Sequence, residues 1–518
     1  MRSFYVETNP ASQRDVHSFA FVVRALLKLE ARFKKFEDMH TRFISHEDGP
    51  SNDLNVDEIW ISLVREARQI CRESATAGSD PDVLSIYHGP AGYAIFSRLV
   101  ASFSDLGPPL DRVGRANLQE NLQQIDRTCL PNIVHSLTAA GWRPKSLGKL
   151  SFLETPVGIA TEVLIDQMKN PESSNSYKQE DLSVCTEVLQ RALRTQADEP
   201  DEDEDDGCEV LYGQAGLLYA LLRLRASSAG ANQEIKINLD SFVNESTIAS
   251  VIRSIITRGR FGASHYASNV SRRSAVPSLM WSWHHKRYLG ASHGVAGILH
   301  VLLMCPLDTI APYIPDILQT IEWLITYQDN EGNWPTSLKQ RYSQKNDLVQ
   351  WCHGAPGMLI LFATLIRRAI RNPEVFPLTT PFLNSLSEAI QRGANIVYQK
   401  GLLRKGVGLC HGVGGSVYAL LAASDAMGMW KQYESSKVYF LRAIHLAHLA
   451  TSYSQLTQAG EMTTPDKPWS LYGGLAGMCC AWAEVYDRLG TTGRNLNQLD
   501  FSWCRLRSGM PGFDDLSE

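Results

Sequence analysis

A short motif, Gly-x-x-Gly or a close variant followed by an apolar run, occurs seven times along this chain. The motifs lie at Gly89–Gly92, Thr155–Gly158, Gly213–Gly216, Gly294–Gly297, Gly354–Gly357, Gly412–Gly415 and Gly474–Gly477. Their spacing is about 60 residues with one longer interval, which is enough for two helices and two connections. The sequence therefore predicts an array of seven helical hairpins.

The two helices of each hairpin differ in character. The run after each glycine turn is apolar nearly all round, which predicts a buried helix. The other helix is amphipathic, as in Asp316–Tyr327 and Phe382–Val397. Buried inner helices with amphipathic outer helices make either an open solenoid or a closed double ring. Closure of seven hairpins head to tail would give an all-α (α/α)7 toroid, but periodicity alone does not decide between the two.

The repeat also determines the expected domain organisation. A chain of 518 residues would by default contain two or three domains, but a continuous array makes residues 1–518 one domain with its core at about 60–490. The longer interval, Ser227–Tyr288, is rich in serine and has no long apolar run. We predict a long exposed loop or insertion there, with a basic stretch at 252–287. The acidic run Asp198–Asp206 is predicted to be a solvated loop.

Composition excludes several classes of function. The net charge of −5 and the pI near 6.3 argue against a nucleic-acid-binding protein. No apolar stretch reaches the roughly 18 residues of a membrane-spanning helix, and the N-terminus has no signal-peptide core. Ten scattered cysteines are typical of reduced thiols in the cytosol. These features predict a cytoplasmic protein without stable membrane insertion, while the basic stretch leaves peripheral contact with a membrane open.

Two adjacent repeats carry potential metal ligands at the same offset from their glycine turns. Cys410 and His411 stand together in LLRKGVGLCHGVGG, and Cys352 stands in QWCHGAPG. Either cysteine alone would be interpreted as a buried apolar residue. Their equivalent positions instead predict a zinc site with two thiolates, one imidazole and an open fourth position. An incoming thiol is a suitable fourth ligand because it ionises when it is coordinated.

A further histidine, His293, stands immediately before the glycine turn of repeat four, where His411 stands in repeat six. Its side chain should face the same end of the ring. A histidine that is not a ligand, next to a metal-bound thiolate, can act as a general acid or base. His353 and His88 occupy equivalent positions and are weaker candidates.

The segments WCHGAPG, GLCHG and WSWHHKRYLGASHGVAG resemble the lanthionine synthetase C family, and most closely its eukaryotic LanC-like branch. The resemblance covers about residues 1–490. It implies an (α/α)7 toroid with a central zinc ion and an enzyme that adds glutathione to dehydroalanine or dehydrobutyrine residues. Those residues form when phosphoserine or phosphothreonine loses its phosphate, so the implied partners are modified proteins, kinases among them.

The resemblance also implies roles for individual residues. Cys352, Cys410 and His411 match the zinc ligands, His293 matches the general acid, and Lys405 matches a lysine that contacts glutathione.

Four further positions are less closely matched. Arg2 resembles an N-terminal arginine of the animal proteins, and Glu209 lies near the position of a catalytic aspartate in the bacterial enzymes. His353 replaces a bacterial tyrosine, which favours the LanC-like branch. Gly473 stands where animal relatives carry glutamate.

Several alternatives remain open from the sequence. The chain could be a non-catalytic regulatory protein that binds zinc and glutathione. An α/α-toroid glycosidase would need a pair of carboxylates, and the glycine turns are interpreted as lacking such a pair. A zinc prenyltransferase has Asp, Cys and His ligands, which this pattern fits less well. A lantibiotic cyclase would require a dehydratase, of which the chain shows no sign.

Overall fold

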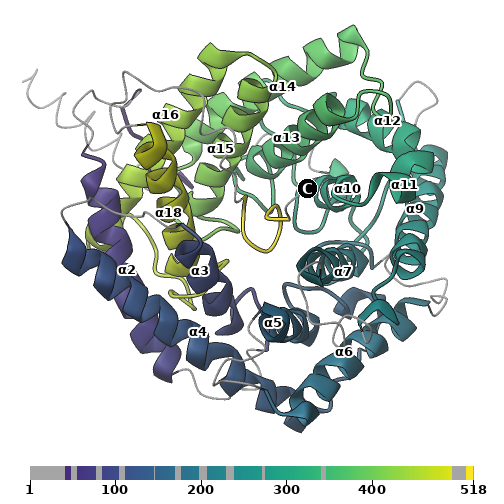
Figure 1. The fold of residues 1–518 in the computed structure, drawn as a ribbon. Coiled ribbons are helices and arrows are strands. Elements are labelled where there is room, and N and C mark those ends of the chain that lie inside the picture. The colour runs from purple at the N-terminus through teal and green to yellow at the C-terminus, as the bar shows by residue number, and fades with distance from the viewer. Residues whose placement is uncertain are drawn as a thin grey trace, which may run out of the picture.

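The computed structural model describes residues 41–47, 49, 55–76, 84–103, 111–144, 146–169, 177–197, 207–228, 239–270, 275–339, 346–492 and 509–516. Within these residues the helices form two concentric rings (Figure 1). The inner ring consists of α3 (Ala91–Ala101), α5 (Pro156–Lys169), α7 (Gln214–Ser228), α10 (Val295–Leu303), α13 (Ala355–Arg371), α15 (Val413–Met429) and α18 (Leu475–Thr492). The outer ring consists of α2 (Asp57–Thr76), α4 (Arg112–Ala140), α6 (Gln179–Ala197), α9 (Glu245–Ser268), α12 (Ile314–Ile325), α14 (Thr380–Lys400) and α16 (Tyr433–Leu449).

Each glycine turn leads directly into an inner helix, as the repeat predicts. These helices are buried on all sides: every residue of α10 is buried, and so is α15 from Val413 to Gly428. The outer helices bury one face only. The two amphipathic segments predicted at 316–327 and 382–397 lie within or next to α12 and α14.

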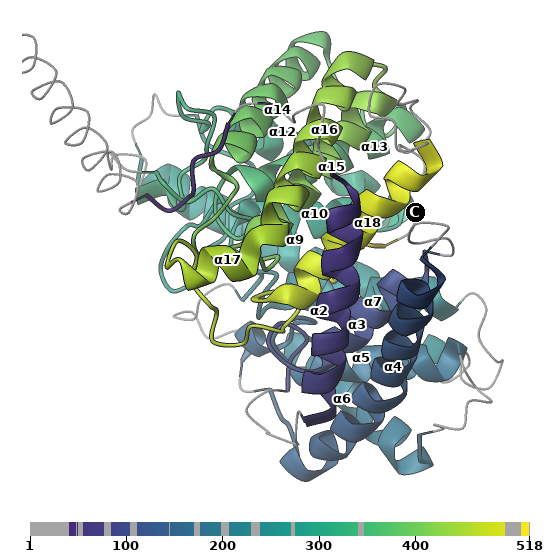
Figure 2. The same ribbon diagram turned by 90° about the vertical axis from the view of Figure 1, so that its left-hand side faces the viewer.

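The ring is closed. Helix α18, the last of the inner ring, packs against α2 and α3, the first outer and first inner helices. The side view shows these three helices together (Figure 2). Closure decides between the two architectures that the sequence left open, and the fold is the (α/α)7 toroid.

The prediction of a long loop at Ser227–Tyr288 is wrong for the central part of this interval. Residues Glu245–Ser268 form α9, the fourth outer helix. Its buried face consists of Ile248, Val251, Ile252, Ile255 and Ile256, spaced as an amphipathic helix requires. These apolar residues do not form a long uninterrupted run, because Ser250, Arg253 and Ser254 lie between them, and the sequence alone therefore predicts a loop. The acidic run Asp198–Asp206 lies outside the described residues.

The last glycine of each turn has no room for a side chain. A Cβ at Gly297 would lie 1.9 Å from the carbonyl oxygen of Ala291 in its own turn and 2.9 Å from Val210 in the preceding turn. The corresponding atom at Gly92 would lie 2.5 Å from the Ile86 carbonyl and 2.9 Å from Leu471 in turn seven. Consecutive turns therefore pack closely against one another around the ring, and the same contact joins the seventh turn to the first.

Residues 509–516 occupy the centre of the inner ring, where they appear as a short yellow segment in Figure 1. Met510 and Phe513 are buried. Phe513 packs edge-on against Trp351 at 5.0 Å between ring centroids. The hydroxyl of Tyr472 donates a hydrogen bond to the Pro511 carbonyl at 3.0 Å. This segment thus fills the bore of the ring beneath the glycine turns.

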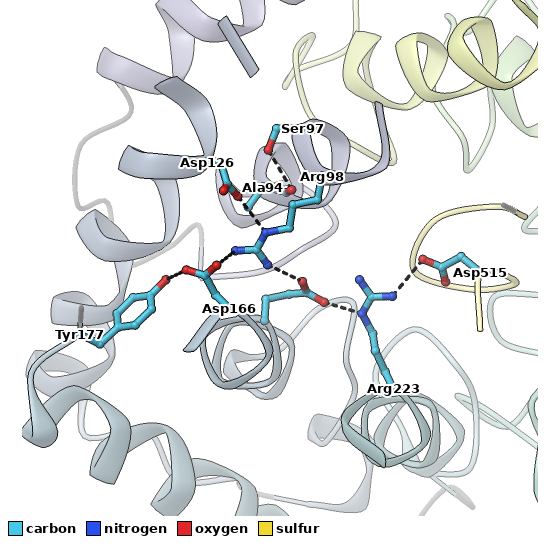
Figure 3. A network of polar contacts seen from close by, with 9 residues as sticks. Ala94, Ser97, Arg98, Asp126, Asp166, Tyr177, Arg223 and Asp515 are labelled. Atoms are coloured by element: carbon cyan, nitrogen blue, oxygen red, sulfur yellow. Dashed lines mark hydrogen bonds and ion pairs between the residues drawn. The ribbon is translucent and has the colours of Figure 1, made fainter. Parts of the chain in front are cut away.

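Charged side chains fix this central segment to the inner helices (Figure 3). Asp515 accepts hydrogen bonds from Tyr219 and Arg223 of α7. The Arg223 guanidinium pairs in turn with Glu162 of α5, which also pairs with Arg98 of α3 at 3.2 Å. Burial opposes ionisation of Glu162, but the two guanidinium groups hold its pKa below the ordinary value. A buried charge cluster of this kind is tolerated because every member has opposite charges within reach.

In the part of the chain that the structure describes, no helix combines the length and apolar character needed to cross a membrane.

The tight glycine packing predicts the effect of adding a single methyl group. Gly297→Ala should lower the free energy of unfolding by at least about 2 kcal/mol, because the new Cβ would overlap backbone that cannot retreat. Urea denaturation would measure the change. Gly490→Ala in α18 is the matched control, since a Cβ there meets nothing within 4 Å and alanine should leave stability equal or higher. Equal stability of both variants would contradict the packing argument.

Candidate functional site

Backbone hydrogen bonds connect neighbouring glycine turns at the residue that stands five positions before each last glycine. Cys352 donates its N–H to the Cys410 carbonyl at 3.2 Å, Cys410 donates to Tyr472 at 2.9 Å, and Tyr472 donates to Tyr87 at 3.2 Å. We call these positions the neck ring. Its members are Tyr87, Leu153, Leu211, Ser292, Cys352, Cys410 and Tyr472. The backbone thus fixes the spacing of the two cysteines, which come from adjacent turns.

The neck ring brings together the three residues that the sequence predicted as metal ligands. One donor atom each from Cys352, Cys410 and His411 lies within 4.8 Å of the other two. Both cysteines are buried and His411 is half-buried. Two sulfurs and one imidazole nitrogen at this spacing fit a tetrahedral metal ion with one position left for another ligand. Within the described residues this is the one group of three or more Cys, His, Asp or Glu that could hold an ion.

Hydrogen bonds favour a negative charge on this pair of sulfurs. Gln350 donates its amide N–H to the Cys352 sulfur at 3.2 Å, and the Tyr87 hydroxyl donates to Cys410. Burial opposes ionisation of Cys352, but hydrogen bonds from Cys410 and His411 hold its pKa well below the ordinary value. Burial and the charge of Cys352 raise the pKa of Cys410. The pair therefore loses its first proton readily and retains the second, until a cation compensates the charge.

The residues that directly follow the neck ring in each turn form a second circle, which we call the rim. Its members are His88, Glu154, Tyr212, His293, His353, His411 and Gly473. Of the three candidate ligands, His411 belongs to the rim, and Cys352 and Cys410 belong to the neck ring. Because equivalent positions of the seven turns face the same end of the toroid, every candidate for proton transfer found in the sequence belongs to this circle or adjoins it.

His293 is held by a carboxylate. Its Nδ1 lies 2.8 Å from the Glu209 side chain, and Glu209 is only 2% exposed. Glu209 also accepts the backbone N–H groups of Leu211 and Tyr212, which fixes the carboxylate within its own turn. The carboxylate directs the proton of the neutral imidazole to Nδ1 and leaves Nε2 available for proton transfer. The Glu209 carboxylate therefore contacts His293 and is not a member of the candidate metal group.

His353 lies near His293, and Lys405 is close enough to His353 to affect its pKa. The rings of His293 and His353 are 6.2 Å apart. Burial lowers the pKa of His353, and the positive charge of Lys405 contributes to the same shift. Lys405 itself is exposed and close enough to act electrostatically on Cys410. Arg2 lies outside the described residues.

Gly473 leaves space that His88 adjoins. A Cβ at Gly473 would be 3.7 Å from the His88 ring. Burial, and then the nearby His411, lower the pKa of His88. The family resemblance leads us to expect glutamate at position 473 of turn seven. The structure has glycine there, with the imidazole of His88 from turn one next to it.

Glu154 is a site residue that the sequence analysis missed. It occupies the rim position of turn two, and burial raises the pKa of its carboxyl to about 7. Ser85, Lys149 and His293 oppose that shift, and the charge of Glu209 adds to it. The statement that the glycine turns lack two carboxylates is therefore wrong. Glu209 is engaged with His293, however, so Glu154 and Glu209 do not form the free acid–base pair of a glycosidase. Counting positions back from each last glycine would have identified both Glu154 and Tyr87.

Comparisons with known proteins agree with this geometry. The family described as "Lanthionine synthetase C-like protein" matches residues 108–488. LanC-like protein GCL1 of Arabidopsis thaliana is 31% identical over 278 residues, which are 54% of this chain and 54% of that protein. Glutathione S-transferase LANCL1 of Danio rerio is 27% identical over 281 residues, which are 54% of this chain and 58% of that protein. The matches thus span little more than half the length of these curated relatives.

The raised pKa of Glu154 predicts a pH-dependent stability difference. Between its ordinary value of 4.5 and the folded value of about 7, the folded state binds more protons than the unfolded state, so stability falls as pH rises. Because glutamine does not ionise, Glu154→Gln should remove this fall in stability with rising pH. The variant should gain roughly 1–3 kcal/mol relative to the native chain between pH 4.5 and pH 8.

Urea midpoints at several pH values would test this. Glu322→Gln, on the exposed face of α12, provides the control. A Glu154→Gln profile parallel to that of the native chain would show that the carboxyl ionises without a penalty.

Proposed function

Because this chain belongs to the lanthionine synthetase C-like family, we propose that it is a zinc-dependent enzyme that adds the thiol of glutathione to dehydroalanine or dehydrobutyrine residues in proteins or peptides. The product is a thioether. The observation that carries the proposal is the position of the Cys352, Cys410 and His411 group, one turn away from the histidine–carboxylate pair of His293 and Glu209.

The donor set favours zinc as the ion. Two thiolates and one imidazole are typical zinc ligands, whereas magnesium and calcium prefer oxygen. When bound, zinc supplies an electrophilic position that keeps an incoming thiol ionised at neutral pH. The protein's own contribution is a buried pair of sulfurs whose spacing the neck ring determines. Tyr87 and Gln350 orient these sulfurs by hydrogen bonds.

His293 would supply the proton that the addition requires. A carbon–sulfur bond forms at the β-carbon, the electron pair of the double bond moves toward the α-carbon and its carbonyl, and the α-carbon must then take up a proton. The thiol releases one proton and the product gains one, so the reaction needs no oxidant or reductant. Glu209 would hold Nδ1 of His293 and so orient Nε2 toward the reacting carbon.

Two observations support glutathione as the thiol: the name of one relative and the positive charge of Lys405. The zebrafish relative carries the name glutathione S-transferase. Lys405, exposed beside Cys410, offers a positive charge to a glutathione carboxylate, and we assign Arg2 and His353 to the same substrate. As the family resemblance implies, acceptors would be proteins that have lost phosphate from phosphoserine or phosphothreonine, kinases among them.

We place this reaction in the cytoplasm. None of the nine cysteines that the structure describes forms a disulfide, which suits a reducing compartment. A thiol-dependent reaction also needs the reduced glutathione that such a compartment supplies.

The first test of the proposal is metal content. Zinc measured by mass spectrometry should be close to one per chain in the native protein and lost in Cys352→Ala and Cys410→Ala, because two protein donors rarely hold zinc tightly. Cys305→Ala is the matched control, since this cysteine is also free and buried but packs between α10 and α11. Zinc retained by both ligand variants would contradict the assignment.

The second test is catalysis. The native chain, glutathione and a dehydroalanine peptide should give a mass gain of one glutathione. His293→Ala should keep its zinc and lose on the order of 10²–10⁴ in kcat, the usual contribution of a general acid. Glu209→Gln should lose less and shift the pH–rate profile. Zinc present without any gain over the uncatalysed rate would leave a protein that only binds zinc and glutathione.

A further inference from the structure

A strained hairpin stands beside His293. Trp283 and Lys286 exchange two backbone hydrogen bonds, of 2.9 and 3.0 Å. The two residues between them, His284 and His285, have positive φ angles of 48° and 58°. Glycine and asparagine are the usual residues in such a turn, and other side chains are held there only by surrounding contacts. The tip is exposed, and the His284 ring packs edge-on against Trp283 at 4.5 Å between ring centroids.

The base of the hairpin is packed against the candidate active site. The ring centroids of Tyr212, Trp283 and His293 lie 6.0–6.1 Å apart, and their planes differ by only 9–15°. Gly148 lets Trp283 approach closely, because a Cβ there would come within 2.7 Å of the indole. Aromatic surface therefore extends without a break from His293 to the exposed tip of the hairpin.

The exposed edge of this side of the site is basic, although the less exposed carboxylates of Glu154 and Glu209 adjoin it and the protein as a whole is acidic. Lys149 is exposed and lies 4.3 Å above the Tyr212 ring. Lys286 is exposed at the hairpin. The two chain segments that meet here, 141–153 and 278–295, contain no aspartate or glutamate, while the whole chain has a net charge of −5. We call Lys149, Tyr212, Trp283 and Lys286 the hairpin wall.

We propose that the hairpin wall docks the acceptor peptide and selects acceptors with acidic residues next to the dehydroamino acid. The inference rests on the proposed function. Planar aromatic rings can pack against the amide planes of an extended peptide, and the two lysines attract carboxylates on either side of the reacting residue. The wall borders His293, while Lys405 lies toward His353 and Cys410. The two substrates would thus approach from different sides.

Two matched peptides test this docking. They share one dehydroalanine and differ only in flanking glutamates or flanking lysines. The native enzyme should show a KM roughly 5- to 10-fold lower for the glutamate peptide, and 0.5 M NaCl should reduce the difference. The double variant Lys149→Glu and Lys286→Glu should reverse the preference, with unchanged zinc content and unchanged KM for glutathione. Trp283→Ala should raise KM for both peptides.

The control is Arg253→Glu, which reverses one charge at an exposed position of α9 away from the hairpin wall and should alter neither KM. A second readout does not depend on turnover: fluorescence anisotropy with peptides that carry alanine in place of dehydroalanine. Equal KM values for both peptides, unaffected by the double variant, would overturn the docking proposal and leave the proposed function intact. Binding that follows charge as predicted, in a protein that modifies neither peptide, would retain the docking surface and overturn the proposed reaction.

Discussion

The fold depends on the absence of a side chain at seven positions. A Cβ on the last glycine of each turn would overlap the backbone of its own turn and would also press on a residue of the preceding repeat. Because the contact recurs between the seventh turn and the first, it fixes both the spacing of the inner helices and the closure of the ring. The buried inner helices and the one-sided outer helices then follow from ordinary apolar burial.

The same glycine turns position the residues of the candidate site. Backbone hydrogen bonds between neighbouring turns place Cys352 and Cys410 side by side, with His411 one residue further along the second turn. Glu209 uses its own turn to hold its carboxylate and then orients His293 from the next turn. The candidate metal group and the proposed proton-transfer pair thus stand on a frame of hydrogen-bonded glycine turns. Such preorganisation is what proton transfer and metal binding both require.

How much could be predicted from the sequence depended on whether a feature repeats. The glycine turns, the inner helices and the equivalent offsets of Cys352 and Cys410 recur, so their grouping was foreseeable. Closure was not, because an open solenoid has the same period. Helix α9 was missed because its isoleucines are separated by serines and an arginine. Glu154 was missed because neither its type nor its neighbours recur in other turns, and its raised pKa arises from burial that only the folded ring creates.

The central position of residues 509–516 bears on how the protein matures during translation. These residues are synthesised after the ring helices, yet Asp515 supplies a partner for Arg223, and Pro511 accepts the hydroxyl of Tyr472 beneath the neck ring. A nascent chain that has emerged from the ribosome only as far as α15 has neither the closing helix nor this central segment. Such long-range contacts slow folding, so Arg223 would lack its Asp515 partner, and Tyr472 its Pro511 partner, until residues 511–515 had been synthesised.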